Sequence, residues 1–492
     1  MKNTIITKFN KTVKQFEHKK AVGDSENSLT YKELQEKAFS IGTFLGEKCI
    51  KEKPIAILME RTCNVPVAML GILASGNFYA VLDPDSPADR LYKILNTLEP
   101  EYIIYDNSTE EIISAIPDIY KRLSYNELLT YESDSFLIHC IQSTIVSEFP
   151  AYTLFTSGST GDPKGVLITH LNVISYIEWF TDCFDINEKT VFGSQTPFYF
   201  SMSVSDFYGA MLTGATYEII PKLYFAFPAN LVNYMNEKKV NTIYWVPSAL
   251  GIIVKFNLFK FTMTDSLEKV LFAGESMPVK YLNYLKSYLP NIMYANLFGP
   301  TETTDICMYY KVNREFKDDE SLPIGSVCQN CEVIIVDDEL YVKGPFIAKG
   351  YYRNKYNTDL AFIQNPTHSD YPDTVYRTGD LVTKNEYNEF MYAGRKDFQI
   401  KHLGYRIEPG EIETVLNSID NSILTLCIHE PVEDILILAY ESSEDKEQEL
   451  KNKAQSSLPS YMHPSKYIRL QNFPINSNGK IDRKVITKTV LK

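Results

Sequence analysis

Short runs of apolar, often β-branched residues alternate with amphipathic segments over roughly the first 320 residues of the chain. The apolar runs are typical of buried strands, with examples at 53–59, 101–106, 240–246 and 267–274. Between them lie stretches with helical periodicity, such as 65–74, which precedes the turn residues Ser75 and Gly76. This alternation predicts βαβ units and a largely parallel sheet covered by helices, so the first part of the chain is expected to be α/β.

The pattern changes after about Leu322. Shorter strands with Gly and Asn turns predict an antiparallel, barrel-like part over 322–396. Further on, the pattern predicts a helix at 410–418, strands at 424–429 and 435–440, and a charged helix at 443–457. We therefore expect a large N-terminal domain, 1–396, and a small α+β domain, 397–492.

Composition narrows the class of protein. The 492 residues are 44% hydrophobic and 23% charged, which is ordinary for a globular protein of two to four folding units. The net charge of −13 disfavours nucleic acid as a partner. The N-terminus is basic but lacks the apolar core of a signal peptide, and no stretch of about 18 uncharged apolar residues occurs, so we expect no membrane partner and a cytoplasmic protein. Eight scattered cysteines fit reduced thiols.

One segment, "TLFTSGSTGDPKG" at 153–165, begins as a buried strand and ends in hydroxyls, glycines and one lysine. Glycines allow backbone N–H groups to converge, and hydroxyls add donors, which suits phosphate oxygens. The spacing differs from that of a P-loop, because Gly165 rather than Ser or Thr follows the lysine. The predicted phosphate-binding residues are Thr156, Ser157, Gly158, Ser159, Thr160, Gly161 and Lys164.

Six further motifs accompany "TSGSTGDPKG" in a fixed order. They are "LTYKEL" (29–34), "NLFGPTETT" (296–304), "ELYVKGPFIAKGYY" (339–352), "YRTGDL" (376–381), "GRKDFQIKHLGYRIEPGEIE" (394–413) and "NGKIDRK" (478–484). Over nearly the whole chain they resemble the adenylate-forming superfamily, in particular the adenylation domains of nonribosomal peptide synthetases and the stand-alone D-alanine:carrier-protein ligase. The resemblance implies a ligase that activates a carboxylic acid with ATP, releases pyrophosphate and passes the acyl group to a phosphopantetheine thiol.

The resemblance also implies roles for individual residues. Lys480 would be the adenylation lysine, Glu302 would hold Mg²⁺ on the phosphates and Thr301 would touch the α-phosphate, while Lys164 would pair with the β- and γ-phosphates. The remaining nucleotide contacts would be Asp380 and Arg395 for the ribose, and Asn296, Phe298, Gly274 and Glu275 around the adenine. Asp397 would be the hinge that turns the loop 401–406 toward the site for the second reaction.

The acyl pocket departs from the pattern of relatives that activate α-amino acids. Where these carry an aspartate that pairs with the α-ammonium, this chain has Ser201, which cannot balance a buried charge. Asp206 is assigned a structural or capping role. Asp305 directly follows "GPTETT", where an apolar residue is common. The predicted pocket residues are Ser201, Met202, Ser205, Tyr244, Leu271, Ala273, Leu297, Asp305 and Ile306.

These residues predict a substrate that is not an ordinary α-amino acid. If Asp305 points inward, a β- or ω-amino acid is expected; if it points to solvent or caps the next segment, a hydroxy or aryl acid. No phosphopantetheine attachment segment follows Lys480, so the carrier protein is expected in trans. Two alternatives stay open: an acyl-CoA synthetase, and an inactive nucleotide-binding scaffold. The acid, the carrier, the pathway and the oligomeric state do not follow from the sequence.

Overall fold

The computed structural model describes residues 3–158, 162–420, 423–431, 433–474 and 481–491. Its contacts divide the chain into two compact units. Unit 1 contains Met1–Pro84, Leu98–Leu154 and Gly165–Lys396, and unit 2 contains Asp85–Thr97, Phe155–Lys164 and Asp397–Lys492. Two short segments of the predicted large domain therefore group with the C-terminal part, and the division into domains 1–396 and 397–492 stays a prediction.

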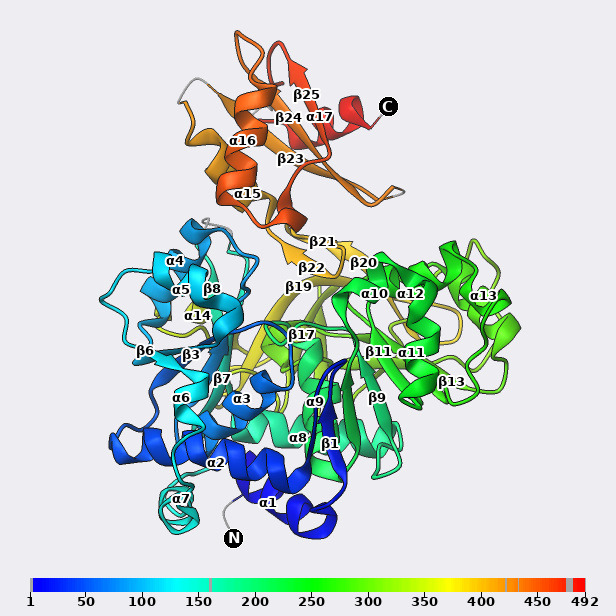
Figure 1. Cartoon of the computed structure of the whole chain (residues 1–492). Helices are drawn as coiled ribbons and strands as arrows, with labels where there is room; N and C mark the ends of the chain where they lie inside the picture. The colour runs from blue at the N-terminus through cyan, green and yellow to red at the C-terminus, as the bar shows by residue number, and fades with distance from the viewer. Residues whose placement is uncertain (1–2, 159–161, 421–422, 432, 475–480, 492) are drawn as a thin grey trace. The chain divides into compact units, whose positions relative to one another are not determined.

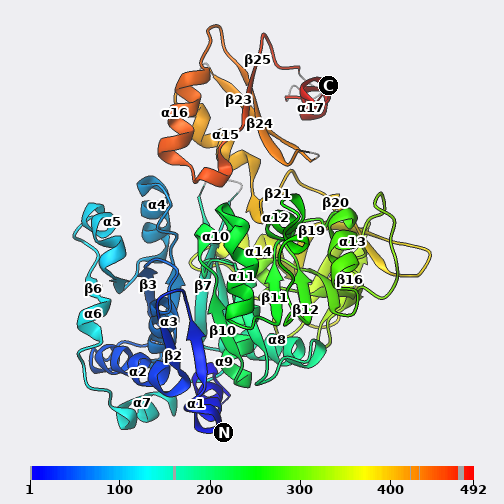
Figure 2. The same ribbon diagram turned by 45° about the vertical axis from the view of Figure 1, so that its right-hand side comes forward.

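Unit 1 contains a nine-stranded sheet, sheet A, whose strands include β9 and β11 (Figure 1). Its strand order is β15-β14-β13-β12-β11-β9-β10-β1-β2, and the five pairings from β13 to β1 are parallel. Figure 2 shows β11 and β12 side by side. The strands are β1 (Lys20–Gly23), β2 (Ser28–Thr30), β9 (Val191–Ser194), β10 (Thr216–Ile219), β11 (Thr242–Trp245), β12 (Lys269–Phe272), β13 (Met293–Phe298), β14 (Met308–Lys311) and β15 (Ser326–Val327).

The second α/β sheet of unit 1, sheet B, has six strands in the order β6-β5-β3-β4-β7-β8, and its pairings from β6 to β7 are parallel. All residues of β3 are buried, as expected where helices cover both faces of a parallel sheet. The strands are β3 (Pro54–Leu58), β4 (Phe78–Val81), β5 (Tyr102–Tyr105), β6 (Arg122–Ser124), β7 (Pro150–Thr156) and β8 (Lys164–Thr169). The predicted α/β class is confirmed.

Helix α9 (Met202–Thr213) connects the two sheets. It packs on β9 and β10 of sheet A, while its Tyr208 hydroxyl lies 2.8 Å from the hydroxyl of Tyr79 in β4 of sheet B. Helix α8 (His170–Cys183) packs beside it, and Figure 1 shows both helices in the middle of unit 1. Residues of α8 and α9 can therefore reach the interior between the sheets.

The remaining helices before Asp397 belong to unit 1, except that residues 88–97 group with unit 2. The predicted helix at 65–74 is α3 (Asn64–Ala74). The others are α1 (Ile5–Phe16), α2 (Tyr31–Glu47), α4 (Ala88–Leu98), α5 (Glu110–Ala115), α6 (Tyr125–Leu128), α7 (Ser135–Gln142), α10 (Lys222–Ala226), α11 (Leu231–Glu237), α12 (Pro247–Lys255), α13 (Val279–Tyr288) and α14 (Lys355–Ala361), with 3-10 turns η1 (Asn107–Thr109), η2 (Pro228–Asn230), η3 (Leu258–Lys260) and η4 (Thr301–Thr303).

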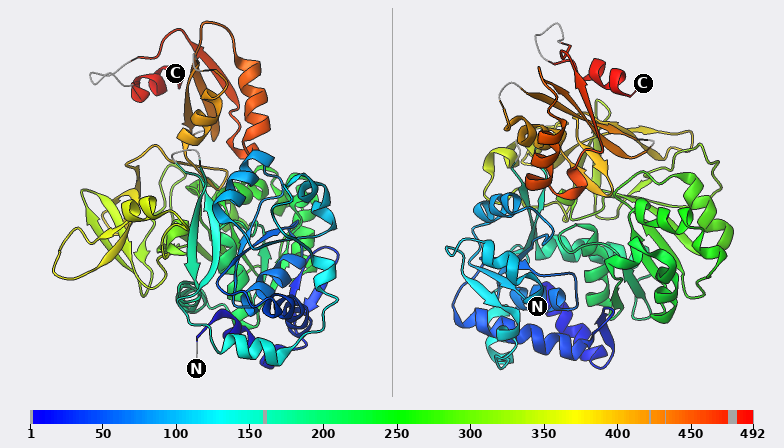
Figure 3. Two further views of the ribbon diagram at one scale, coloured as in Figure 1. Left: turned by 90° about the vertical axis from the view of Figure 1, so that its left-hand side faces the viewer. Right: turned by 45° about the horizontal axis from the view of Figure 1, so that its top comes forward.

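Sheet C is the antiparallel part that the sequence places after residue 322. It comprises β16 (Glu332–Val336), β17 (Glu339–Lys343), β18 (Phe362–Gln364), β19 (Thr374–Lys384) and β20 (Phe390–Arg395). The order is β16-β17-β19-β18, with β20 paired to β19, so the pairings of the described strands form an open sheet rather than a closed barrel. Figure 3 (left) shows these yellow strands at one side of unit 1.

In unit 2, a three-stranded sheet of β23 (Leu424–Glu430), β24 (Ile435–Glu441) and β25 (Lys466–Leu470) is buried on both faces. Alternate residues divide between the faces. Cys427, Leu436 and Leu438 join the cluster with α15 (Pro409–Asn417) and α16 (Glu447–Ser457), whereas Leu426, Ile428, Ile437 and Ala439 join the cluster with α17 (Arg483–Val490). A two-stranded hairpin, β21 (Ile400–His402) and β22 (Tyr405–Ile407), precedes α15, and η5 (Ser460–Met462) follows α16.

A glycine contact between α2 and α3 provides a test of the packing. A Cβ added at Gly71 would lie 2.7 Å from both the Ala38 carbonyl oxygen and the Ile41 Cβ, so one helix would have to move. We expect Gly71→Ala to lower the free energy of unfolding by about 1–3 kcal/mol, measured by urea denaturation.

The matched control is Gly209→Ala in α9, where the added Cβ meets Phe180 at an ordinary 3.5 Å. It should be neutral or stabilising by up to about 1 kcal/mol, because alanine is the better helix former. Equal effects of the two substitutions would contradict the close approach of α2 and α3.

Candidate active site

Asp305 is a buried carboxylate at the centre of a cluster of hydroxyl groups in unit 1. Asp305 is only 2% exposed. The Oδ2 atom accepts hydrogen bonds from the Tyr244 hydroxyl at 3.0 Å, the Tyr176 hydroxyl at 3.2 Å and the Ser205 hydroxyl. Asp305 therefore points inward, and the solvent-facing or capping alternative is wrong.

Separate elements bring these hydroxyls together. Tyr176 comes from α8, Ser205 from α9 and Tyr244 from the buried strand β11. Asp305 follows η4, and Thr304 between them has a φ of +67°, a conformation that turns the chain sharply. The hydroxyls of Tyr176 and Ser205 also lie 2.7 Å apart, so the cluster is continuous.

Burial raises the pKa of Asp305 to about 6, although the hydroxyls of Ser205, Tyr244, Tyr176 and Ser201 oppose the rise by favouring the ionised form. The carboxylate is therefore ionised at pH 7–8, but burying its charge costs free energy that pairing with a nearby cation would offset. Burial also raises the pKa of Tyr176 and Tyr244 well above the usual value, so both act as neutral donors.

A second buried carboxyl, that of Asp206, has a different protonation state at neutral pH. It lies inside α9, four residues beyond the first residue of the helix, so the capping alternative is wrong and the structural alternative stays a prediction. Its Oδ1 accepts the Phe207 N–H at 2.8 Å. Burial raises its pKa to about 8, against the opposing effects of Ser194, the Phe207 N–H and Arg61. At neutral pH Asp206 is mostly protonated, and Asp305 is the better partner for a cation.

The other predicted pocket residues lie around this cluster or on the strands beside it. Ser201 precedes the first residue of α9 and makes no capping bond there, and its hydroxyl favours the ionised form of Asp305. In the parallel register, Tyr244 of β11 is opposite Leu271 of β12. Ala273 directly follows β12 and is buried. The remaining three predicted residues, Met202, Leu297 and Ile306, are also buried.

Tyr176 is a member of the cluster that the sequence analysis missed. It lies in none of the motifs, and its helix reads as an amphipathic packing segment. The one available signal was physical: a tyrosine on the buried face of a helix needs a hydrogen-bond partner for its hydroxyl. Here that partner is Asp305.

The two predicted ribose-binding residues face each other across β19 and β20. Asp380 is paired with Arg395 in the antiparallel register, and the Arg395 guanidinium lies 2.8 Å from the Asp380 carboxylate. Both side chains are buried. The ion pair fixes the orientation of the carboxylate, which matters for a group expected to accept two hydroxyls.

The predicted phosphate, metal and adenine residues of unit 1 also have structural partners. Glu302 is buried and its Oε1 accepts the Tyr351 hydroxyl at 2.7 Å; Thr301, beside it, begins η4. The Asn296 amide donates to the Pro323 carbonyl at 2.8 Å. The other predicted adenine residues are Phe298, Glu275 and Gly274. The ring of Phe298 packs against Tyr392, and the Glu275 carboxylate accepts the Ser248 N–H at the start of α12. Gly274 has a φ of +90°.

The predicted phosphate-binding segment belongs to unit 2. Gly158 admits no side chain, because a Cβ there would lie 2.0 Å from the Asp162 carbonyl oxygen. The Ser157 hydroxyl donates to the Arg406 carbonyl at 2.6 Å, Thr156 ends β7 and Lys164 begins β8. Ser159, Thr160, Gly161 and Lys480 lie outside the described residues. The predicted cradle and the Asp397 hinge therefore stay predictions.

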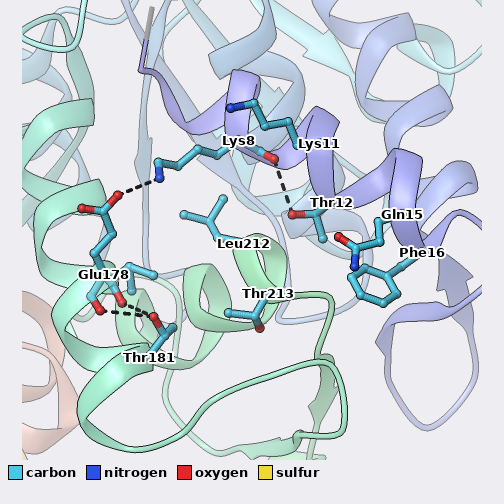
Figure 4. Close-up of a pocket in the computed structure, with 10 residues that line it drawn as sticks. Lys8, Lys11, Thr12, Gln15, Phe16, Glu178, Thr181, Leu212 and Thr213 are labelled. Carbon is cyan, nitrogen blue, oxygen red and sulfur yellow. Dashed lines mark hydrogen bonds and ion pairs between the residues drawn. The ribbon is translucent and has the colours of Figure 1, made fainter. Parts of the chain in front are cut away.

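A separate polar cavity of about 260 Å³ lies among α1, α8 and the C-terminal end of α9 (Figure 4). Lys8 of α1 and Glu178 of α8 form an ion pair at 2.7 Å across it. Its α9 residues, Leu212 and Thr213, are about 10–12 Å along the helix from Ser205, given a rise of about 1.5 Å per residue. The cavity shares none of the predicted acyl-pocket residues.

Among the described residues, no helix is long and apolar enough to cross a membrane. All eight cysteines are free thiols.

The fold and the motifs define an enzyme class that the family comparison confirms. The model of the AMP-binding enzyme family matches residues 9–352, and the chain belongs to this family. Adenylation domains of nonribosomal peptide synthetases and carrier-protein ligases are among its relatives, so the predicted resemblance is confirmed.

Particular relatives cover nearly the whole chain. Zwittermicin A synthase ZmaJ of Bacillus cereus is 31% identical over 95% of this chain and 91% of its own length. The D-alanine--D-alanyl carrier protein ligase of Lacticaseibacillus casei is 28% identical over 100% of both. By contrast, the chain spans only 9% of bacitracin synthase 1 of Bacillus licheniformis, to which it is 30% identical.

Solved structures share the fold. The Vibrio cholerae adenylation domain AlmE, in complex with glycyl-adenosine-5'-phosphate, superposes with a TM-score of 0.85 at 19% identity, covering 100% of this chain and 98% of that one. The o-succinylbenzoate CoA synthetase of Bacillus subtilis, a double mutant, gives 0.84 at 18% identity, covering 99% and 98%.

The raised pKa of Asp305 predicts a specific pH dependence of stability. The native carboxyl has a pKa of about 6 and the unfolded one about 3.9, so the native state binds more protons between these values and loses stability as the pH rises through them. Asp305→Asn removes this loss. Its free energy of unfolding should exceed that of the wild type by about 1–3 kcal/mol at pH 7.5, and the difference should shrink below pH 6.

Asp206→Asn is the matched comparison in the same urea experiment. The pKa of Asp206 is about 8, so the gain in free energy of unfolding of Asp206→Asn over the wild type should keep growing up to pH 8. The corresponding gain of Asp305→Asn should level off above pH 6. A difference for Asp305→Asn that does not vary with pH would contradict a raised pKa.

Proposed function

We propose that this protein activates a carboxylic acid with ATP to an acyl-adenylate and then transfers the acyl group to the phosphopantetheine thiol of a carrier protein. In the first step a carboxylate oxygen of the acid bonds to the α-phosphorus and pyrophosphate leaves. In the second, the thiolate sulfur bonds to the acyl carbon and AMP leaves. Membership of the AMP-binding family and the full-length match to a carrier-protein ligase support this proposal.

The acid is a β- or ω-amino acid, and the buried carboxylate of Asp305 is the observation that carries this assignment. In this pocket the neutral Ser201 stands where α-amino acid activators have their anion, and the anion lies instead on Asp305. A substrate ammonium displaced from the α position would pair with Asp305. Such a pairing neutralises a charge that burial alone makes unfavourable.

A hydroxy or aryl acid fits the cluster less well. Three protein hydroxyls already donate to Oδ2 of Asp305. Another hydroxyl would add a hydrogen bond but leave the negative charge uncompensated. The geometry of the described residues therefore favours a cationic group over a neutral one.

The nucleotide would be held by the residues that the motifs identify. The Asp380 carboxylate, oriented by Arg395, suits the two ribose hydroxyls. Glu302 offers one buried carboxylate, which suits Mg²⁺ because this ion combines one or two carboxylates with phosphate oxygens and water. Mg²⁺ would neutralise charge on the phosphates. Lys164 and Lys480 would add positive charge there, and rotation about Asp397 would separate the two reactions.

An acyl-CoA synthetase remains the second candidate, supported by the shared fold of the o-succinylbenzoate CoA synthetase. Such an enzyme would catalyse the same first step and would differ only in the thiol that accepts the acyl group, which would be coenzyme A. A cytoplasmic location, where ATP and carrier proteins are available, completes the proposal.

The test is ATP–pyrophosphate exchange with Mg²⁺ and a panel of β-amino, ω-amino, α-amino, hydroxy and aryl acids. We expect the largest kcat/KM for a β- or ω-amino acid. Asp305→Asn should lower that value by about 100-fold, because a buried ion pair loses one partner. Asp206→Asn, which removes an equally buried but largely protonated carboxyl, should keep the wild-type preference.

Each part of the proposal fails separately. If no acid in the panel supports pyrophosphate exchange, the result would favour the alternative that the protein is an inactive nucleotide-binding scaffold. A preference for an α-amino, hydroxy or aryl acid that Asp305→Asn does not alter would refute the substrate class. Acylation of free coenzyme A but not of a carrier protein would favour the synthetase.

A further inference from the structure

Two histidines and one aspartate meet at one point of unit 2, and one of them, His402, belongs to the loop 401–406 described above. His402 lies in β21, His429 in β23 and Asp434 in the turn between β23 and β24. The Asp434 Oδ1 is 2.9 Å from His402 Nδ1 and 2.7 Å from His429 Nε2. One ligand atom from each residue lies within 4.8 Å of the other two.

The donor set has a defined chemical preference. Two imidazole nitrogens and one carboxylate oxygen suit Zn²⁺ and related divalent transition metals, with a water completing a tetrahedron. Mg²⁺ and Ca²⁺ prefer oxygen ligands throughout. The nitrogens that face the carboxylate need lone pairs to bind a metal, and the other tautomer of each neutral ring supplies them.

The backbone presents these groups to one another. His402 lies on a three-residue strand. The His402 side chain is only 8% exposed, so the imidazole ring lies inside the unit rather than at the surface of the unit. Asp434 has a φ of +51°, in the left-handed region that an aspartate tolerates better than most residues. The His402 and His429 rings lie 5.8 Å apart, centre to centre.

We propose that His402, His429 and Asp434 form a site for a divalent transition-metal ion, with Zn²⁺ as the representative ligand, that fastens the β21–β22 hairpin to the β23–β24 hairpin. The hairpin β21–β22 is a two-stranded sheet of three residues per strand, and such small sheets have little stability of their own. A metal ion bound to both hairpins would stabilise this part of the unit. This site does not depend on the proposed function.

The experiment uses the full chain without a histidine tag, freed of metal by dialysis against a chelator. Titration with Zn²⁺ by calorimetry should give one ion per chain, and Co²⁺ should give the intense visible absorption of a tetrahedral complex. His429→Gln and Asp434→Asn should each weaken binding by at least about tenfold. His139→Gln, which changes an exposed histidine of α7, should leave binding unchanged. Millimolar Mg²⁺ should not compete.

A hydrogen-bonded cluster without metal would use the same contacts, and the experiment separates the two. No binding of Zn²⁺ and Co²⁺, or binding that neither His429→Gln nor Asp434→Asn weakens, would overturn the site. Since the variants can be poorly folded, X-ray absorption of the zinc-loaded wild type gives a second measurement. It should show two imidazole nitrogens and two oxygens, one from Asp434 and one from water, and any other ligand set would equally refute the proposal. Pyrophosphate exchange tests the proposed function separately.

Discussion

The structure of the candidate acyl pocket depends on one electrostatic constraint, the burial of the Asp305 carboxylate. A carboxylate removed from water is costly unless donors or cations compensate it. Here Tyr176, Ser205 and Tyr244 supply donors from α8, α9 and β11. They lower the cost but do not remove it, because the pKa stays raised at about 6. The remaining imbalance is the basis of the proposed preference for a cation, and it makes the carboxylate a source of instability that function would justify.

The two-sheet architecture explains how three hydroxyls from distant parts of the chain reach one oxygen atom. The helix α9 packs on β9 and β10 of sheet A and contacts sheet B through Tyr208 and Tyr79, so its residues line an interior rather than a surface. In this interior Asp206 and Asp305 are both buried, yet they differ in their protonation at neutral pH. The difference in surroundings, rather than in residue type, selects Asp305 as the anion.

Much of the fold could be predicted from the sequence, because buried strands and amphipathic helices have clear periods. The strands β3, β5, β11 and β12 and the helix α3 lie where the pattern placed them. The open form of sheet C was missed, since strand closure depends on pairings that hydrophobic alternation does not encode. In the site, the resemblance to the adenylate-forming family indicated Asp305, Ser205 and Tyr244. It could not indicate Tyr176, whose role follows from packing of α8 beside α9, nor the inward orientation of Asp305, which depends on the backbone turn at Thr304.

The central claim is that the Asp305 carboxylate pairs with an ammonium of the substrate, and a thermodynamic cycle tests it most directly. Dissociation constants would be measured for the preferred amino acid and for the same acid with its amino group replaced by hydrogen, each with the wild type and with Asp305→Asn. The account predicts a coupling of about 2 kcal/mol or more, so that the amino group strengthens binding only when the carboxylate is present. A coupling near zero, with the amino group contributing equally in both proteins, would contradict it.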